Sequence, residues 1–298
     1  GYKRSDGRVG TANYWLFIPT VFCENRNLDV IREAMHNELG YAVTAKYKSY
    51  THQLLEAYQS GEDISSVDLS PSVTSQKIRP FKNVDGIKFL NHQGGCGGIR
   101  QDSEVLAKLL AGYVNNPNVA GATVLSLGCQ NLQIDIFKKV LKDMNPNFNK
   151  EILIYEQQQM GTVDNMLRTI IKDSYSAILK ANAIERKPAP LSKLVIGLEC
   201  GGSDGFSGIS ANPALGVVSD IMVALGGKTI LAEFPELCGV EQELMNRCVD
   251  EEKANKFLSL MKAFEKSVVD AGSGFDMNPS PGNIKDGLIT DAMKSAGA

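Results

Sequence analysis

Three glycine-rich loops, at 92–98, 128–131 and 197–208, carry most of the side chains that could do chemistry. Each loop follows a short apolar run and delivers one cysteine. Glycine lets a backbone approach a ligand closely, because it has no Cβ atom. A carboxylate with an imidazole suits a hard divalent metal, whereas thiolates suit softer iron or zinc sites. The three loops therefore predict a ligand-binding or metal-binding site.

The loop at 197–208 is the richest of the three, with Glu199, Cys200, Ser203 and Asp204. Buried carboxylates are costly unless they are paired, hydrogen-bonded or bound to a metal, and two lie on this one turn. The alternative is a glycine-rich anion-binding nest in which Asp204 has a structural role. The glycines match neither the dinucleotide nor the P-loop spacing, so neither NAD nor ATP is expected.

The other two loops have both a functional and a structural interpretation. His92 and Cys96 can converge on a ligand, or His92 can hydrogen-bond a strand end while Cys96 is a small buried group. Cys129 and Asn131 place a thiol and an amide at the end of a strand, or belong to a tight turn that needs glycine. Arg100 can hold a carboxylate through two hydrogen bonds, or be a solvated residue at a helix start.

Weaker candidates lie elsewhere in the chain. Glu233 or Glu236 could add a carboxylate to the site, although surface charge explains them equally well. The turn at 278–283 offers amide and hydroxyl groups, suited to a polyhydroxylated ligand or to a simple crossing between elements. Cys23 and Cys248 are expected to be structural.

Apolar periodicity indicates alternating strands and helices. Strands are expected at 14–21, 86–90, 122–127, 152–155, 194–198 and 228–232. Helices are expected at 27–39, 102–115, 134–144, 163–182, 213–225 and 252–271, with a further helical segment near 52–58 in a long polar excursion. Alternation of this kind predicts an α/β fold with mainly parallel sheets and helices on both faces, a Rossmann-like layering without the dinucleotide motif. Such sheets bind ligands at the carboxyl ends of their strands.

A domain boundary is expected in the segment 187–193, whose two prolines cannot continue the preceding helix. It divides the chain into a first α/β domain at 1–187, with the His92, Cys96 and Cys129 loops, and the start of a second at 188–298, with the Glu199–Asp204 loop. A length of 298 residues accommodates two domains. If both domains contribute, the reaction takes place in the cleft between them.

Composition narrows the class of protein. A formal net charge of −3 argues against nucleic acid as a partner, and no apolar run approaches the ~18 residues that a membrane span needs. Six cysteines without a secretory segment predict reduced thiols and a cytoplasmic protein. The first residue is not methionine and the chain ends abruptly, so a fragment is expected.

The loop motifs, taken in order, resemble the altronate dehydratase and galactarate dehydratase family. The resemblance rests on the glycine-rich string 197–205, on the start at 4–13, and on four further motifs at 92–96, 128–131, 211–213 and 278–283. It runs over essentially the whole chain and covers only part of the family's architecture, so N-terminal and C-terminal domains are expected beyond it. Two departures stand out: Gln130 where many relatives have Glu, and Ala298 where some have Cys. Neither residue can be an anionic ligand.

The resemblance implies dehydration of a sugar acid, most simply D-altronate, to a 2-keto-3-deoxy sugar acid by metal-assisted removal of the proton beside the carboxylate. It implies His92 as general base or metal ligand, and Glu199 and Asp204 as catalytic or hydroxyl-binding groups. The expected thiolates toward the metal are Cys96, Cys129 and Cys200. The expected substrate-binding residues are Arg100, Asn131, Ser203, Asn212, Asn278, Ser280 and Asn283. Iron(II) is the expected metal, with manganese(II) as an alternative.

Three alternatives accompany this interpretation. The substrate could be galactarate, the chain could be a non-catalytic sugar-acid binding module, or Cys96, Cys129 and Cys200 could hold an iron–sulfur cluster. The expected partners are the small-molecule substrate, the remaining domains and further copies of the chain in a homo-oligomer, without nucleic acid or membrane.

Overall fold

A computed structural model describes the chain except for residues 43–44, 70–78, 200, 202–203, 275–279 and 289–298. The contacts divide it into two compact units, Gly1–Ala189 and Pro190–Ala298. The division falls inside the segment 187–193. Each unit is described by itself below.

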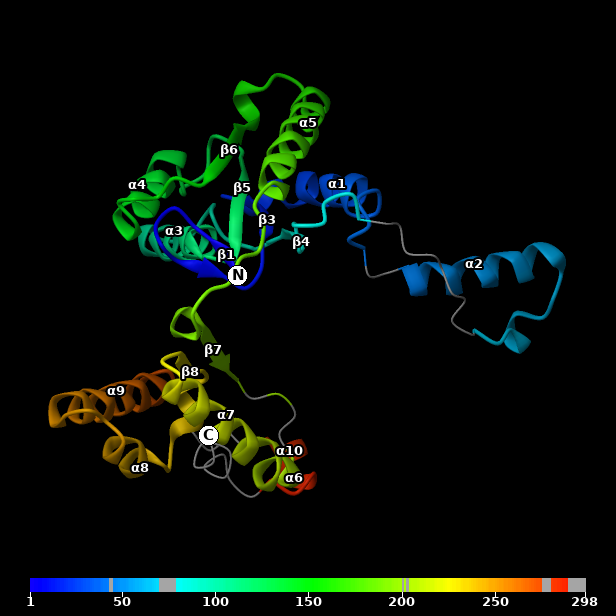
Figure 1. Ribbon diagram of the computed structural model, residues 1–298. Helices are drawn as coiled ribbons and strands as arrows, with labels where there is room; N and C mark the ends of the chain where they lie inside the picture. Colours follow the sequence, from blue (N-terminus) through cyan, green and yellow to red (C-terminus); the bar gives the residue numbers. More distant parts are fainter. Residues whose placement is uncertain (43–44, 70–78, 200, 202–203, 275–279, 289–298) are drawn as a thin grey trace. The chain divides into compact units, whose positions relative to one another are not determined.

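The first unit is built on a four-stranded parallel sheet with the strand order β4-β3-β5-β6 (Figure 1). The strands span Gly86–Phe89 (β4), Tyr14–Pro19 (β3), Val119–Ser126 (β5) and Glu151–Glu156 (β6). The first strand of the sheet, β3, therefore lies between its second and third strands, β4 and β5. This order has one reversal point, between β3 and β5.

Both faces of the sheet are covered by helices, because side chains alternate along each strand. Trp15 and Phe17 pack with helices α1 (Asn25–His36) and α5 (Val163–Asn182) in one core. Leu16 and Ile18 pack on the other face with α3 (Arg100–Asn115) and α4 (Ile134–Met144). The predicted α/β fold is confirmed. The predicted bounds of α4 and α5 match those observed.

A chain of buried hydroxyl groups connects the layers of the first unit. The Trp15 Nε1–H group donates to Thr123 Oγ1 at 3.0 Å, and Thr123 Oγ1 lies 2.8 Å from Ser174 Oγ on α5. Thr123 and Ser174 are fully buried, and a buried polar group costs free energy unless it is hydrogen-bonded. The contacts therefore fix the register of α5 against the sheet.

The start of the chain forms a short antiparallel hairpin of β1 (Tyr2–Lys3) and β2 (Val9–Gly10), which the apolar pattern did not predict. Arg4 Nε donates to Pro117 O at 2.7 Å, and an Arg8 NH2 group donates to Asn115 Oδ1 at 2.8 Å. Gly1 and Lys187 exchange two backbone hydrogen bonds, of 2.6 and 2.9 Å. Contacts distant in sequence therefore hold the hairpin.

The polar excursion between α1 and β4 contains α2 (Ala45–Ser60) and the short 3-10 helix η2 (Ile64–Ser66). Helix α2 is longer at both ends than the predicted segment near 52–58. Its Tyr47 and Tyr58 side chains are exposed.

The second unit pairs two parallel strands, β7 (Val195–Leu198) and β8 (Lys228–Leu231). Between them lie α6 (Gly205–Ile209) and α7 (Ala211–Ala224), and after them come α8 (Glu241–Asn246), α9 (Glu251–Asp270) and α10 (Pro281–Lys285). Helix α7 exposes several large apolar side chains, namely Leu215, Val217, Val218, Ile221 and Val223. Within the described part of the chain, no helix is both long and apolar enough to cross a bilayer.

Candidate active site at the carboxyl edge of the sheet

Four loops meet at the carboxyl edge of the parallel sheet, one after each strand. The loop after β3 contains the 3-10 helix η1 (Phe22–Glu24), and the loop after β6 contains η3 (Gln157–Gln159). The loops after β4 and β5 are the glycine-rich segments at 92–98 and 128–131. Open α/β sheets bind ligands outside the carboxyl ends of the strands, at the point where the strand order reverses. Here that point lies between the loops after β3 and β5.

Gly94 and Gly95 connect three of these loops. Phe22 N–H donates to Gly94 O at 3.0 Å, and Asn131 N–H donates to Gly95 O at 2.9 Å. Gly95 has φ +96°, and a Cβ atom there would collide with Thr20 O and lie 2.6 Å from Val21 Cα. The β4 loop can therefore reach across β3 to the β5 loop only because residue 95 is glycine.

His92 holds this arrangement through both of its ring nitrogens. Nε2 lies 2.7 Å from Pro19 O, and Nδ1 accepts from Gly94 N–H at 3.1 Å. A carbonyl can only accept, so the proton is on Nε2 and the ring is the neutral Nε2–H tautomer. In this conformation His92 orients two loops, and its role as base or metal ligand stays a prediction.

Three cysteines lie on these loops, and all three are free and exposed. Cys96 and Cys129 were expected here. Cys23, expected to be structural, lies in η1 directly after β3. Cysteine is among the residues most often fully buried, so three exposed thiols at one sheet edge are unusual. Cys23 lies four residues beyond the end of β3, where the sequence predicted no candidate residue.

Gln130 is buried and shapes the β5 loop. Its Oε1 accepts from Gly128 N–H at 2.6 Å, and its Nε2 group donates to Ser126 Oγ at 2.5 Å and to Leu132 O at 3.2 Å. An amide can make both kinds of contact, whereas a carboxylate in this position could not donate. Gln130 therefore stabilises a turn that presents Cys129 to solvent.

Glu24 is a buried carboxyl group that sequence reasoning missed. Its side chain is fully buried, Oε2 accepts from Asn27 Nδ2 at 2.8 Å, and Oε1 has no hydrogen-bond partner. Burial raises the pKa of Glu24, and the bond from Asn27 only partly opposes this. Asn27 Nδ2 also donates to Gln157 Oε1 at 3.1 Å. Asn27 therefore links Glu24 of the β3 loop to the β6 loop. An acid in the first turn of a helix is usually solvated, so the pattern gave no signal.

Arg100 begins α3 immediately after the β4 loop and is exposed. Its exposed position is compatible with either alternative, a carboxylate-binding group or a solvated residue at a helix start, and its role stays a prediction. Across the described residues, no three His, Cys, Asp or Glu side chains are close enough together to hold one metal ion. The described donors of this edge therefore do not form a site for a single metal ion.

The second unit brings other predicted residues together. Asp204 Oδ1 accepts from Ser207 N–H at 2.8 Å and caps α6, which is the structural role considered for it. Gly205 N–H donates to Asp286 O at 3.2 Å, so this cap lies beside α10. Ser280 caps α10 and contacts Asn283, so residues expected to form a rigid turn partly form a helix.

The remaining predicted residues are more dispersed. Glu199 is exposed after β7, and Asn212 is half-buried near the start of α7. Glu233 has φ 58° and precedes the 3-10 helix η5 (Phe234–Leu237), which contains Glu236. Three predicted residues, Cys200, Ser203 and Asn278, lie outside the described residues.

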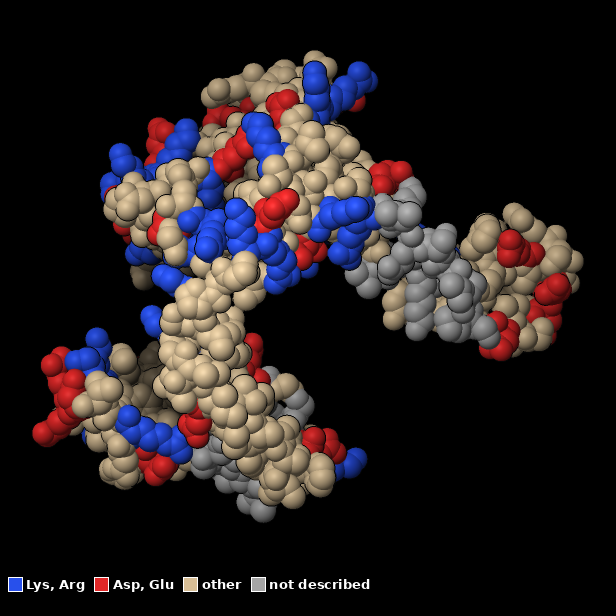
Figure 2. Space-filling model, viewed as in Figure 1, with Lys and Arg blue, Asp and Glu red and all other residues tan. Residues whose placement is uncertain are grey.

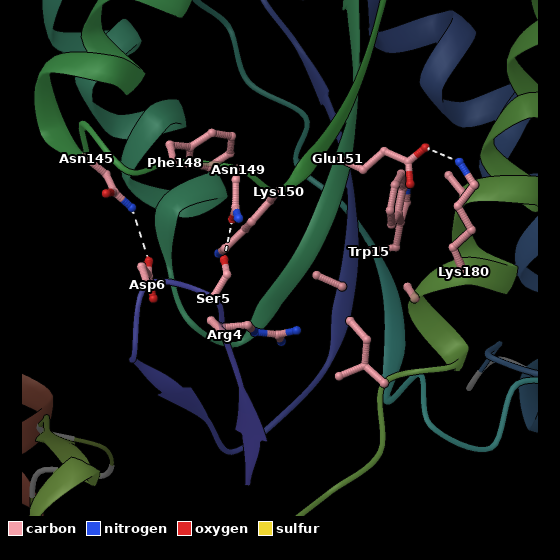
Figure 3. A pocket seen from close by; sticks show the side chains of 14 residues that line it. Arg4, Ser5, Asp6, Trp15, Asn145, Phe148, Asn149, Lys150, Glu151 and Lys180 are labelled. Carbon is pink, nitrogen blue, oxygen red and sulfur yellow. Dashed lines mark hydrogen bonds and ion pairs between the residues drawn. The ribbon is translucent and has the colours of Figure 1, made fainter.

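A cavity of about 230 Å³ lies at the opposite edge of the sheet, where the strands begin (Figure 3). Arg4, Lys150 and Lys180 line it, and Lys180 pairs with Glu151 at 2.7 Å. Figure 2 shows Lys and Arg side chains gathered on the side of the first unit where the chain starts. Burial, followed by repulsion from Arg4, lowers the pKa of Lys150 to about 7. None of the predicted catalytic residues lies in this cavity.

Comparison with known protein families gives a match for each of the two units of the chain. Residues 1–182 match the model of the "D-galactarate dehydratase/Altronate hydrolase, second domain", and residues 191–298 match "D-galactarate/Altronate dehydratase, C-terminal". The chain belongs to the galactarate and altronate dehydratase family. The two matched regions correspond to the two structural units.

Three curated relatives carry these names. The altronate dehydratase of Bacillus subtilis is 33% identical over 100% of this chain and 51% of its own length. The altronate dehydratase of Escherichia coli is 31% identical over 99% of this chain and 51% of its length. The galactarate dehydratase (L-threo-forming) of Escherichia coli is 32% identical over 61% of this chain and 36% of its length. The chain thus spans about half the length of the altronate dehydratases it matches.

Proposed function

We propose that this chain is the part of a sugar-acid dehydratase that carries the carboxyl-edge site, with D-altronate as the substrate. Altronate is preferred to galactarate because of the share of this chain that each named relative matches. The proteins named altronate dehydratase match 99% or more of the chain, whereas the galactarate dehydratase matches 61%. Galactarate is the second candidate, since its dehydratase is equally similar over the part that it matches.

The reaction removes the C2 proton of the aldonate and expels the C3 hydroxyl as water. The C2–H electron pair becomes the C2=C3 bond, the C3–O bond breaks toward its oxygen, and a proton completes the water. The resulting enol becomes the 2-keto-3-deoxy acid. Charge develops on the substrate carboxylate as the proton leaves, so cationic groups that face it lower the barrier.

Residues at the carboxyl edge have chemistry suited to these steps. Arg100, exposed at the start of α3, can hold the substrate carboxylate through a bidentate pair. Asn131, exposed on the β5 loop, can hydrogen-bond a hydroxyl group. His92 can serve as base only after one of its ring nitrogens leaves its backbone partner. In the second unit, Glu199 and Asp204 are the proposed carboxylates.

Iron is the cofactor proposed with this reaction. When bound, it would act as a Lewis acid toward the oxygens of the substrate. The described donors do not converge on one ion, whereas the exposed thiols suit iron by their softness.

The test uses the full-length natural protein that contains this chain. Hexonates and hexarates are supplied with iron(II), with manganese(II) or with a chelator, and the 2-keto-3-deoxy product is measured. Altronate is expected to be turned over with iron and to lose turnover with the chelator. Turnover of galactarate alone would replace the substrate, and no product from any sugar acid would refute the class.

Two variants test the proposed residues. Arg100→Lys keeps the charge but loses the planar pair of donors, so KM for altronate is expected to rise at least about tenfold with a smaller change in kcat. His92→Ala is expected to lower kcat, and unchanged turnover would remove His92 from the mechanism. Arg168→Lys, an exposed arginine paired with Asp164 on α5, is the matched control and should change neither constant.

A further inference from the structure

Two cationic side chains in the cavity at the amino edge of the sheet, where the strands begin, have no carboxylate partner. Asp6 and Glu151, the carboxylates of the cavity wall, already lie 2.6 and 2.7 Å from other cationic side chains. Arg4 and Lys150 also line the cavity, and neither forms an ion pair with a described carboxylate. The wall therefore carries an excess of positive charge.

Backbone carbonyls hold both of these cations in place. Lys150 Nζ donates to Val114 O at 3.0 Å and to Asn116 O at 2.5 Å, and Arg4 Nε donates to Pro117 O at 2.7 Å. These carbonyls lie at or just beyond the carboxyl end of α3. Such an end carries about half a negative charge, which balances only part of two cations. The fold fixes the two side chains but does not neutralise them.

The electrostatics of the cavity favour the arrival of an anion. Burial, followed by repulsion from Arg4 and Arg8, lowers the pKa of Lys150. Burial also lowers the pKa of Arg4. A charge removed from water is costly unless it is paired, so an anion between these two side chains would offset that cost.

The rest of the wall indicates a small organic ligand. Trp15, Phe148 and Ile184 contribute apolar surface, whereas Ser5 and Asn149 contribute a hydroxyl and an amide group (Figure 3). Ser5 and Asn149 are exposed and contact each other. The cavity of about 230 Å³ is smaller than the ~300–1,000 Å³ of sites for drug-sized ligands. An inorganic ion would leave the apolar part of the wall uncovered.

We propose that the amino-edge cavity binds a small hydroxylated carboxylate. Arg4 and Lys150 hold the carboxylate through charge-assisted hydrogen bonds. The apolar side chains contact the carbon chain, and Ser5 and Asn149 bind its hydroxyl groups. This site is separate from the carboxyl-edge loops, and its assignment does not depend on the proposed dehydratase function.

The test measures binding to the chain by calorimetry and by the emission of Trp15. Trp15 is the single tryptophan and lines the cavity, so a ligand bound there should change its fluorescence. The probes are D-gluconate, glucitol, which lacks the carboxylate, hexanoate, which lacks the hydroxyl groups, and inorganic phosphate. Gluconate is expected to change the emission and to bind at least about tenfold more tightly than the other three.

Variants locate the binding site. Lys150→Met and Arg4→Gln should each weaken gluconate binding at least about tenfold. Lys139→Met, at an exposed lysine paired with Asp143 on α4, is the matched control and should bind as the wild type does. Arg100→Lys, at the carboxyl edge, should also leave the Trp15 response unchanged. The emission of each variant without ligand verifies that the first unit is folded, and Lys150→Met alone decides if Arg4→Gln loosens the hairpin.

Four results would each overturn the proposal. They are no binding of gluconate to the wild-type chain, full affinity in folded Lys150→Met, loss of the Trp15 response in Arg100→Lys, and phosphate binding as tight as that of gluconate. Turnover by the full-length protein is measured separately. Binding at the cavity without turnover would leave this site assigned and refute the proposed function, and turnover without such binding would do the reverse.

Discussion

Replacing Gly95 by alanine should damage the first unit more than the same change at Gly97, two residues away. Both glycines have positive φ, +96° and +74° respectively. Left-handed backbone costs an L residue about 1–2 kcal/mol at either position. Only at Gly95 does the new methyl group also meet backbone, at Thr20 O and Val21 Cα, whereas nothing lies within 4 Å of a Cβ at Gly97.

The backbone of Thr20 and Val21 cannot move aside easily, because both residues are fully buried. Overpacking of this kind adds about 1–3 kcal/mol. Gly95→Ala should therefore lower the free energy of unfolding by about 2–5 kcal/mol and Gly97→Ala by about 1–2 kcal/mol. With an m value of about 2 kcal/mol/M in urea, the two midpoints should differ by about 0.5–1.5 M.

Trp15 is the chain's only tryptophan and is buried in the first unit, so its fluorescence reports the unfolding of that unit alone. Urea titrations of the wild-type chain and both variants supply the midpoints. Equal midpoints for Gly95→Ala and Gly97→Ala would refute the claim that contact with the β3 loop requires glycine. A lower urea midpoint for Gly97→Ala than for Gly95→Ala would mean that residue 97, and not residue 95, is the position without room for a methyl group.

Three further predictions concern charged groups. The pKa of Lys150 is lowered from 10.5 to about 7 in the folded chain. Between these values the folded chain binds fewer protons than the unfolded chain, so the free energy of unfolding should rise from about pH 7 to 10. Lys150→Met should flatten that rise, measured as urea midpoints across this pH range. The Arg8 side chain lowers the pKa of Asp6 to about 2, so this carboxylate stabilises the fold above about pH 4 and loses its effect toward pH 2; Asp6→Asn should remove that part of the acid dependence. Asp204 caps α6, so Asp204→Ala should lower the free energy of unfolding by about 1 kcal/mol and Asp204→Asn by much less. Turnover of the full-length protein then separates two roles. An equal loss of turnover in both variants means that Asp204 acts through its charge, whereas normal turnover in Asp204→Asn means that it acts as a cap.

The sequence predicted the layered fold well where local signals agree. Helix α5 begins after Thr162, whose hydroxyl accepts from Asn165 N–H at 3.2 Å, and the apolar stripe continues to Asn182. Strand β3 is buried on both faces and is a nearly continuous apolar run, as expected of a parallel strand. The β1 and β2 hairpin was missed because its stability comes from Arg4 and Arg8, which contact residues more than a hundred positions away.

The candidate site was predicted in part, for a similar reason. Cys96 and Cys129 were singled out because each lies next to glycine after an apolar run, and the structure places them on loops that contact each other. Cys23 was passed over because Phe22 and Glu24 flank it instead. The strand order places Cys23 at the carboxyl edge, because it brings the β3 loop beside the β5 loop, and no local pattern contains that order.

The paired ends of the first unit have a consequence for how it is used. Gly1 and Lys187 exchange two backbone hydrogen bonds, so the polypeptide enters and leaves this unit at the same point. A module with adjacent ends can be inserted into a longer chain, or exchanged between chains, without stretching what flanks it. The carboxyl-edge loops lie at the other end of the sheet from this junction. Changes in the segments joined at Gly1 and Lys187 can therefore accumulate without disturbing the cysteines of those loops.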